Sequence, residues 1–272
     1  MRSWWNFTFF MAAGAAFAAL AADAPAAAAP KVSGVEVVGT DLRVALSDGR
    51  TLSGQGLLGM VLGLRSEAGE PLRVKIEAVT ADPKDKTGEV LLYRFTARDG
   101  AGNWQPICSP GPDGLRLGIP QPGADGKLVI WCTAGALGKC VRFGYHPWGH
   151  LPDGTPLARY HRACVNMVRA DYTGDERPTT RTGMLIDIFD HVGINAPEPG
   201  PNAMPFEAAW GETGALCVAH VRVPQNVSLD RLVEMAPRFR GRVGAACTEA
   251  AAKEWGEPLL FNRSRGNGIP GP

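Results

Sequence analysis

The 272-residue sequence predicts an α+β protein in which a β-rich N-terminal half, a small antiparallel sandwich or open barrel, precedes a disulfide-linked α+β half. Three observations predict this fold. Short apolar runs separated by turn residues fill residues 32–131, as in compact β proteins. Helical patterns begin at residue 132. Six cysteines follow an N-terminal export signal, and an even cysteine count in an oxidising compartment predicts three disulfides.

Residues 1–22 have the features of a signal peptide. Arg2 supplies the positive start, residues 4–20 are largely apolar, and small residues precede the expected cleavage after Ala22. An uncleaved anchor is the alternative, but the second half of the run is alanine and therefore only weakly hydrophobic. Residues 23–31 are an Ala/Pro spacer that we expect to be disordered. The sequence therefore predicts a secreted or periplasmic protein with no stable membrane insertion after cleavage.

Residues 32–131 alternate short β-type runs with turns. In the run around Val74 and Ile76, apolar and polar residues alternate, so that one face of the strand would meet the core and the other would meet water. The loop at residues 82–86 is charged and contains a proline. The predicted strands are residues 35–38, 42–46, 72–79, 90–97, 115–119 and 127–131.

Residues 132–257 mix helices and strands. Thr133 can cap a short helix over residues 134–143, and Thr155 followed by Pro156 opens a longer helix over 156–170. Further on, we expect strands at 184–189 and 216–223 and helices at 228–235 and 245–255. The tail at residues 258–272, rich in Gly, Asn, Arg and Pro, is expected to be flexible.

The cysteines are expected to form disulfides with one another, although sequence alone cannot choose the pairing. A zinc site would need a closely spaced cysteine pair or a histidine at ligand spacing, and neither is present. A catalytic thiol would need an unpaired cysteine beside a histidine, which an even count disfavours. We therefore predict no metal, and six disulfide-bonded residues: Cys108, Cys132, Cys140, Cys164, Cys217 and Cys247.

The charge balance argues against a nucleic-acid partner. Lys and Arg number 28 against 27 Asp and Glu, so the formal net charge is only +1. Nucleic-acid binding would require a basic stripe with interleaved aromatics, and the short cluster of Arg238, Arg240 and Arg242 is better explained as a solvated helix end. No phosphate-cradling glycine loop and no GxSxG elbow is present, so we predict no cofactor.

Residues 161–194 hold the densest set of reactive side chains in the chain. The candidates for catalysis are His161, Asp171 and Asp175, since paired carboxylates with a nearby base can perform acid/base hydrolysis. Aspartate is also a preferred turn residue, and the flanking arginines could neutralise the cluster, so a structural role is favoured. The four aspartates, including Asp187 and Asp190, could also form an oxygen-rich cation site. Asp187 and Asp190 are three apart on an expected strand and would point to opposite faces, so their spacing does not imply a shared metal.

The histidines and aromatics also have two interpretations each. His161 precedes Cys164 by one helical turn and could act as a base, but a hydrogen bond to a loop carbonyl beside a disulfide is favoured. Pro147 and Gly149 prevent a regular helix between His146 and His150, which disfavours a metal-binding pair. The following aromatics could line a ligand groove, although packing against a disulfide core is favoured: Tyr145, Trp148, Tyr172 and Trp210.

Several segments together resemble a known family. They include the tetrapeptide Ala170-Asp171-Tyr172-Thr173, the segments 132–141 and 144–148, and the strand-rich stretch before them. With these residues, the chain from about 34 to 247 resembles the ADYC domain family of secreted bacterial proteins. The resemblance implies export and no assigned activity. Thr173 stands where the family has its cysteine, and Glu176 replaces a common glycine, so a nucleophile or a loop-bound ligand cannot be carried over to these positions.

Taken together, the sequence predicts a binding or structural module at the cell envelope, with an unidentified envelope or extracellular ligand. The alternative is a hydrolase of envelope polymers that uses Asp171 and Asp175 with His161 nearby. A hydrolase would place these side chains together in a concave pocket with shifted pKa values. A scaffold would leave the carboxylates paired with arginine or facing solvent.

Overall fold

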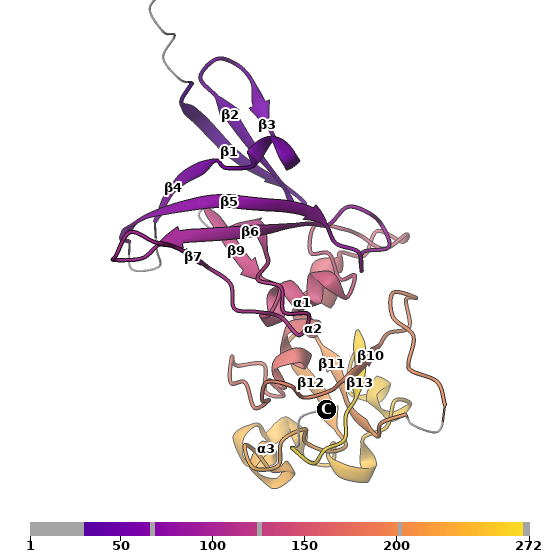
Figure 1. Cartoon of the computed structure of the whole chain (residues 1–272). Helices are drawn as coiled ribbons and strands as arrows, with labels where there is room; N and C mark the ends of the chain where they lie inside the picture. Colours follow the sequence, from indigo (N-terminus) through magenta and orange to yellow (C-terminus); the bar gives the residue numbers. More distant parts are fainter. Residues whose placement is uncertain (1–29, 66–68, 124–126, 201–202, 269–272) are drawn as a thin grey trace, which may run out of the picture.

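The computed structural model describes residues 30–65, 69–123, 127–200 and 203–268. The protein is a strand-rich α+β fold with three antiparallel sheets, which confirms the predicted fold class. Figure 1 shows two sheets at one end of the molecule, the third sheet at the other end, and helices α1 and α2 between them. The predicted signal peptide at residues 1–22 lies outside the described residues, as does most of the spacer.

The first sheet is a meander of three strands. A two-residue turn at Gly39 and Thr40 joins its first two strands, and Gly39 takes a positive φ of 63°, which glycine adopts without strain. Lys31, expected in the disordered spacer, is held instead by backbone pairing with Ser47. The strands are β1 (Val32–Val38), β2 (Asp41–Leu46) and β3 (Thr51–Leu52).

The second sheet has the order β4-β5-β6-β8-β9, with β7 paired to β6. Its apolar face and that of the first sheet share one core, in which Leu42 and Val44 lie with Ile76 and Phe95. This is the predicted sandwich. The elements are η1 (Gly54–Leu57), β4 (Val61–Arg65), β5 (Pro71–Ala81), β6 (Leu91–Arg98), β7 (Trp104–Pro106), β8 (Gly118–Pro122) and β9 (Leu128–Cys132).

Two helices follow, α1 (Ala136–Arg142) and α2 (Leu157–Arg169). Their predicted starts were wrong by one or two residues. Gly135 and Pro156 occupy the N-cap positions, while the Thr133 hydroxyl donates to the carbonyl of Leu117 and so ties the chain to the β-rich half. Helix α2 ends at Arg169 because Ala170 takes a left-handed conformation.

Helix α1 docks against the β-rich half. Val141 packs in a small apolar cluster with Leu92, Leu117 and Ile119. Arg142 donates to both carboxylate oxygens of Asp82, at 2.7 and 3.1 Å, and its side chain is 10% exposed. Because a largely desolvated bidentate pair is geometrically specific, this contact fixes the orientation of α1 on the sheet.

The third sheet has the order β10-β13-β11-β12. Its strand β13 (Leu260–Arg263) lies between two neighbours, so the prediction of a flexible tail over 258–272 was wrong for these residues. The side chains of Leu260, Phe261 and Asn262 are fully buried. The other strands are β10 (Asp187–Phe189), β11 (Phe206–Gly211) and β12 (Gly214–Val218), of which β10 and β12 are shorter than predicted.

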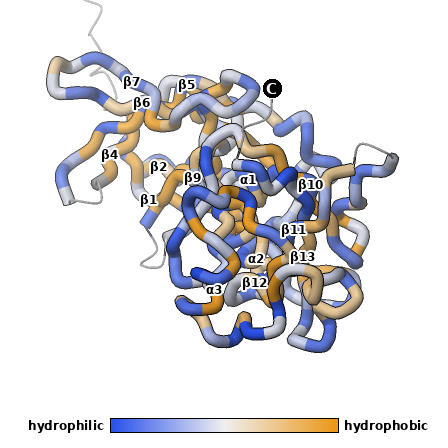
Figure 2. Tube along the Cα trace, turned by 90° about the horizontal axis from the view of Figure 1, so that it is seen from below, coloured by the Kyte–Doolittle hydropathy of each residue, from blue (hydrophilic) through white to orange (hydrophobic). Residues whose placement is uncertain are grey.

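Short helices cover the end of this sheet. Ser228 caps α3 (Leu229–Met235) by accepting from the Arg231 amide, as predicted. The predicted helix over 245–255 was wrong: the chain forms two 3-10 turns instead, because Cys247 between them takes an extended conformation and is tied into a disulfide. The 3-10 turns of this region are η2 (Pro237–Phe239), η3 (Gly244–Ala246) and η4 (Ala251–Glu254). In Figure 2, hydrophobic residues gather along the strands, and hydrophilic residues mark the outer loops.

All six cysteines form disulfides, which confirms the predicted number. The cysteines pair in order along the chain, first with second, third with fourth and fifth with sixth, and the bonds join Cys108–Cys132, Cys140–Cys164 and Cys217–Cys247. The first holds the β-rich half, the second joins α1 to α2, and the third ties β12 to the turns that follow α3. Thus, both halves of the molecule are cross-linked.

We expect reduction of these bonds to destabilise the protein strongly. Each disulfide restricts the unfolded chain, and losing one from a secreted domain typically costs roughly 2–5 kcal/mol. Thermal unfolding followed by circular dichroism, with and without a reductant, measures the effect. Cysteine-to-alanine replacement of the Cys140–Cys164 pair is the matched variant without reductant. An unchanged midpoint in both experiments would contradict the structural role of the bonds.

Candidate functional site

The Ala-Asp-Tyr-Thr motif forms the turn that ends α2. Ala170 has a φ of 48°, and the amide of Asp171 returns to the carbonyl of Asn166. The Asp171 side chain is buried, and its Oδ1 accepts from the amide of Gly174 at 3.0 Å. Asp171 therefore closes the turn with its own carboxylate, as in the structural interpretation of the sequence.

Tyr172 points from this turn into the core of the α+β half. Its hydroxyl donates to Glu207 Oε1 at 2.9 Å and accepts from the backbone amide of Arg222 at 2.8 Å. Its ring stacks on that of Trp210, with ring centres 5.3 Å apart. A buried tyrosine hydroxyl needs polar partners, and this one has both a donor and an acceptor.

Glu207 and Arg222 form a buried ion pair beside Tyr172. The guanidinium donates from Nε at 3.0 Å and from Nη2 at 2.9 Å, one bond to each carboxylate oxygen, and both side chains are at most 1% exposed. Asn262 of β13 donates to the same carboxylate at 2.8 Å. Four elements therefore meet at one carboxylate: the motif turn, β11, β13 and the segment after β12.

The rest of the Arg222 guanidinium closes the end of α2. It donates to the carbonyls of Met167 at 2.9 Å and Val168 at 3.1 Å, which lie in the last turn of the helix, where carbonyls run out of helical partners. The Met167 carbonyl also accepts from the amide of the C-cap residue Ala170. A cation at a helix C-terminus is also favoured by the helix dipole. We call the set of Tyr172, Glu207, Arg222 and Asn262 the motif cluster.

The electrostatics of the motif cluster keep the ion pair charged. Burial raises the pKa of Glu207, but the charge of Arg222 and the hydrogen bonds from Arg222, Ser264 and Asn262 together lower it by more, so the pKa lies below its usual value. Burial, reinforced by Glu207, raises the pKa of Tyr172 well above its usual value. The cluster is a sealed structural unit in which each charge already has its partner.

The other predicted carboxylates are held elsewhere. Asp175 accepts from the Thr173 hydroxyl and pairs with exposed Arg177 at 3.0 Å. Asp190 accepts from the Tyr145 hydroxyl at 2.9 Å and also from loop amides. Asp187 accepts from the amide of Glu198 and lies 3.6 Å from Arg263. Each of these aspartates thus has its own separate set of partners.

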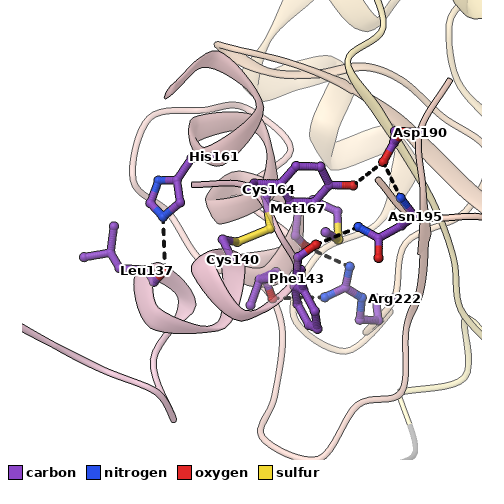
Figure 3. The surroundings of a disulfide bond; sticks show 11 residues. Leu137, Cys140, Phe143, His161, Cys164, Met167, Asp190, Asn195 and Arg222 are labelled. Atoms are coloured by element: carbon purple, nitrogen blue, oxygen red, sulfur yellow. Dashed lines mark hydrogen bonds between the residues drawn. A yellow bond between two sulfur atoms is a disulfide. The ribbon is translucent and has the colours of Figure 1, made fainter. Parts of the chain in front are cut away.

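His161 lies on a different side of the disulfide Cys140–Cys164 from Asp190, as Figure 3 shows. Its Nε2 is 3.1 Å from the carbonyl of Leu137 in α1, and its ring stacks on Trp131 at 5.2 Å between centres. Within the described residues, no hydrogen bond joins His161 to Asp171 or Asp175. The three candidate side chains therefore have separate hydrogen-bond partners. His161 lies between the β-rich half and the α+β half of the molecule.

Burial lowers the pKa of His161 from 6.5 to about 4. The unfolded chain therefore binds the proton more readily, so the contribution of His161 to stability is complete above pH 6.5 and is lost as the pH falls toward 4. We expect protonation of this residue to lower the free energy of unfolding by up to about 3 kcal/mol between neutral and acidic pH.

The measurement compares the parent with His161→Gln, which can still donate to Leu137 but does not titrate. Urea unfolding of each protein at several pH values between 4 and 7 should give a shallower pH dependence for the variant. Parallel curves for the two proteins would show that His161 is not held neutral by the fold.

His146 and the aromatic candidates are packed into the structure, whereas His150 and His191 are exposed. His146 stacks on Trp148 with centres 5.1 Å apart, and its Nε2 lies 3.8 Å from Asp85. Tyr145 and Trp210 are fully buried. In the part of the chain that the structure describes, no three or more His, Cys, Asp or Glu side chains are grouped to hold a metal ion.

Sequence reasoning missed Glu207, Arg222 and Asn262. A signal was present for two of them, because Glu207 and Arg222 are single opposite charges inside otherwise apolar strand-like runs. A charge in such a run is almost never fully buried unless it is paired. Asn262 gave no comparable signal, since it is an uncharged polar residue between a short apolar run and a polar, glycine-rich stretch near the end of the given sequence.

These features define a class: a disulfide-linked, strand-rich α+β protein whose tetrapeptide turn is anchored by a buried ion pair. The family model of the ADYC domain matches residues 54–224, more than half of the chain. The protein belongs to the ADYC domain family. No curated protein sequence and no solved structure matches this chain.

Proposed function

We propose that this ADYC domain protein is exported and acts as a binding or structural module, in the periplasm or outside the cell, toward an envelope or extracellular ligand. Three disulfides suit an oxidising compartment, and residues 1–22 have the composition of an export signal. No helix in the described segments is long and apolar enough to cross a membrane.

One observation carries the choice of a module over an enzyme. The reactive side chains of the motif region are used within the protein: Asp171 closes a turn, Tyr172 joins a buried ion pair, and His161 bonds to a helix carbonyl. A hydrolase needs an acid and a base facing a common space large enough for substrate. The geometry favours a rigid framework whose surface makes the contacts.

Location and activity can be tested on the same protein. Osmotic shock of cells that express a tagged chain should release it with all six thiols oxidised, and deletion of residues 1–22 should leave it inside the cell. Recovery of the full-length chain from the cytoplasm with free thiols would overturn the proposal.

Purified protein is then mixed with isolated envelope material and with dye-labelled peptidoglycan. We expect saturable co-sedimentation without release of soluble dye. Release of dye that is lost in Asp175→Asn would establish the hydrolase instead, because Asp175 is exposed and its replacement should not disturb the fold. Asp230→Asn, on the first turn of α3, is the matched control.

A further inference from the structure

Among the residues that the structure describes, none pairs with the outer edge of strand β1, which is apolar. In the order β1-β2-β3 it is an outer strand, and among its seven residues three valines are exposed: Val32 at 46%, Val35 at 43% and Val38 at 44%. Figure 1 shows the hairpin of β1 and β2 at the end of the molecule remote from α3. A long, mainly uncharged edge strand is a template for pairing with another strand.

The side chains of two of these valines continue the core face. Directly opposite residues of an antiparallel pair point to the same face, and Val35 lies opposite Val44 while Val32 lies opposite Leu46. Val44 and Leu46 are buried in the sandwich core. Val32 and Val35 therefore extend an apolar surface beyond the covered part of the core.

The backbone of this edge is also open to pairing. The two-residue turn makes Val38 and Asp41 a hydrogen-bonded pair, and such pairs alternate along the hairpin. The pair of Val35 and Val44 is then a non-bonded one, so the N–H and C=O of Val35 point away from β2. The irregularity between Val32 and Gly34 shifts the alternation and gives Val32 the same outward direction.

We propose that β1 pairs with β1 of a second copy of this chain, antiparallel and about a two-fold axis near Ser33 and Gly34. This register sets Val32 against Val35 of the other copy, so the outward backbone groups meet and the exposed valines cover one another. It also sets Lys31 against Glu36 of the other copy, on the opposite face. The small residues at the axis permit close approach.

Charge complementarity identifies the occupant as a copy of this chain. Lys31 and Glu36 are the only charged residues at the edge from 31 to 38, and the two-fold axis that joins the valines also joins these opposite charges, twice per dimer. Opposite charges across a strand pair contribute roughly 0.2–1 kcal/mol each, whereas like charges directly opposite are destabilising. In a symmetric dimer the same strand supplies both charges, so the spacing of Lys31 and Glu36 matches itself. A strand of a different protein has no symmetry that would impose this match.

Sedimentation analysis of the purified exported protein over a range of concentrations tests the pairing. We expect a reversible dimer. Glu36→Lys places a lysine opposite Lys31 of the other copy, twice per dimer, and should raise the dimer dissociation constant at least about tenfold. The swap Lys31→Glu with Glu36→Lys should restore the original dissociation constant. Val35→Lys should also separate the copies. Leu185→Lys, at an equally exposed apolar residue, should have no effect. Thermal unfolding of each variant shows whether its fold is retained.

A protein that stays monomeric at high concentration would overturn the proposal, as would a dimer that Val35→Lys leaves intact. A dimer that Glu36→Lys weakens but the charge swap does not restore would also overturn it, since the pairing would then follow another register.

Discussion

Replacing Glu207 with alanine should lower the free energy of unfolding by roughly 3–5 kcal/mol, because removing one partner of a buried ion pair leaves the other charge uncompensated. Arg222 would keep its bonds to the end of α2 but lose both bonds to the carboxylate. Tyr172 and Asn262 would each lose an acceptor as well. The family turn, α2 and two strands would lose their common anchor.

Urea unfolding of Glu207→Ala measures this loss. Glu234→Ala is the matched control, since Glu234 pairs with Arg231 on the exposed face of α3, where such pairs contribute at most about 1 kcal/mol. The double variant Glu207→Leu with Arg222→Met should be more stable than Glu207→Ala alone, because it removes both buried charges. Equal losses for Glu207→Ala and Glu234→Ala would contradict the role assigned to the motif cluster.

Ending the chain after Pro258 should abolish folding of the α+β half. Strand β13 pairs with β10 on one side and β11 on the other, so its loss divides the third sheet and exposes Trp210, whose indole N–H donates to Asn262. Phe261→Ala alone should cost roughly 3–5 kcal/mol, as for other buried aromatics.

Amide dispersion in two-dimensional NMR spectra reports the fold of the truncated chain. Arg265→Ala, just beyond the strand and exposed, is the control and should change stability by no more than about 0.5 kcal/mol. A truncated chain with native-like spectra would show that the third sheet forms without its inner strand.

The sequence predicted the helices and strands whose formation depends mainly on their own residues. Alternation around Val74 and Ile76 predicted β5, and the start signal of Thr155 and Pro156 predicted α2 to within one residue. The parity of the cysteines predicted three disulfides but not their pairing, because pairing depends on which loops the fold brings together.

Elements that depend on distant partners were missed. Asn262 lies in a segment that reads as a polar tail, and it is buried only because Trp210 and Glu207 supply its hydrogen bonds from another strand. The predicted helix around Cys247 was lost to a disulfide with Cys217, thirty residues earlier in the chain. For the site, the turn role of Asp171, the arginine partner of Asp175 and the carbonyl partner of His161 followed from residue type and spacing, whereas the contacts of the motif cluster depend on the assembled sheet.

The disulfide pattern has a consequence for biogenesis. Since the first cysteine is joined to the second, the third to the fourth and the fifth to the sixth, the three loops are neither nested nor interlaced. In the export that we propose, the N-terminus emerges first, so the first thiol of each pair meets its correct mate before the thiols of the next pair emerge. Oxidation in that order would yield the final connectivity directly, with an oxidant and without an enzyme that reshuffles mispaired bonds.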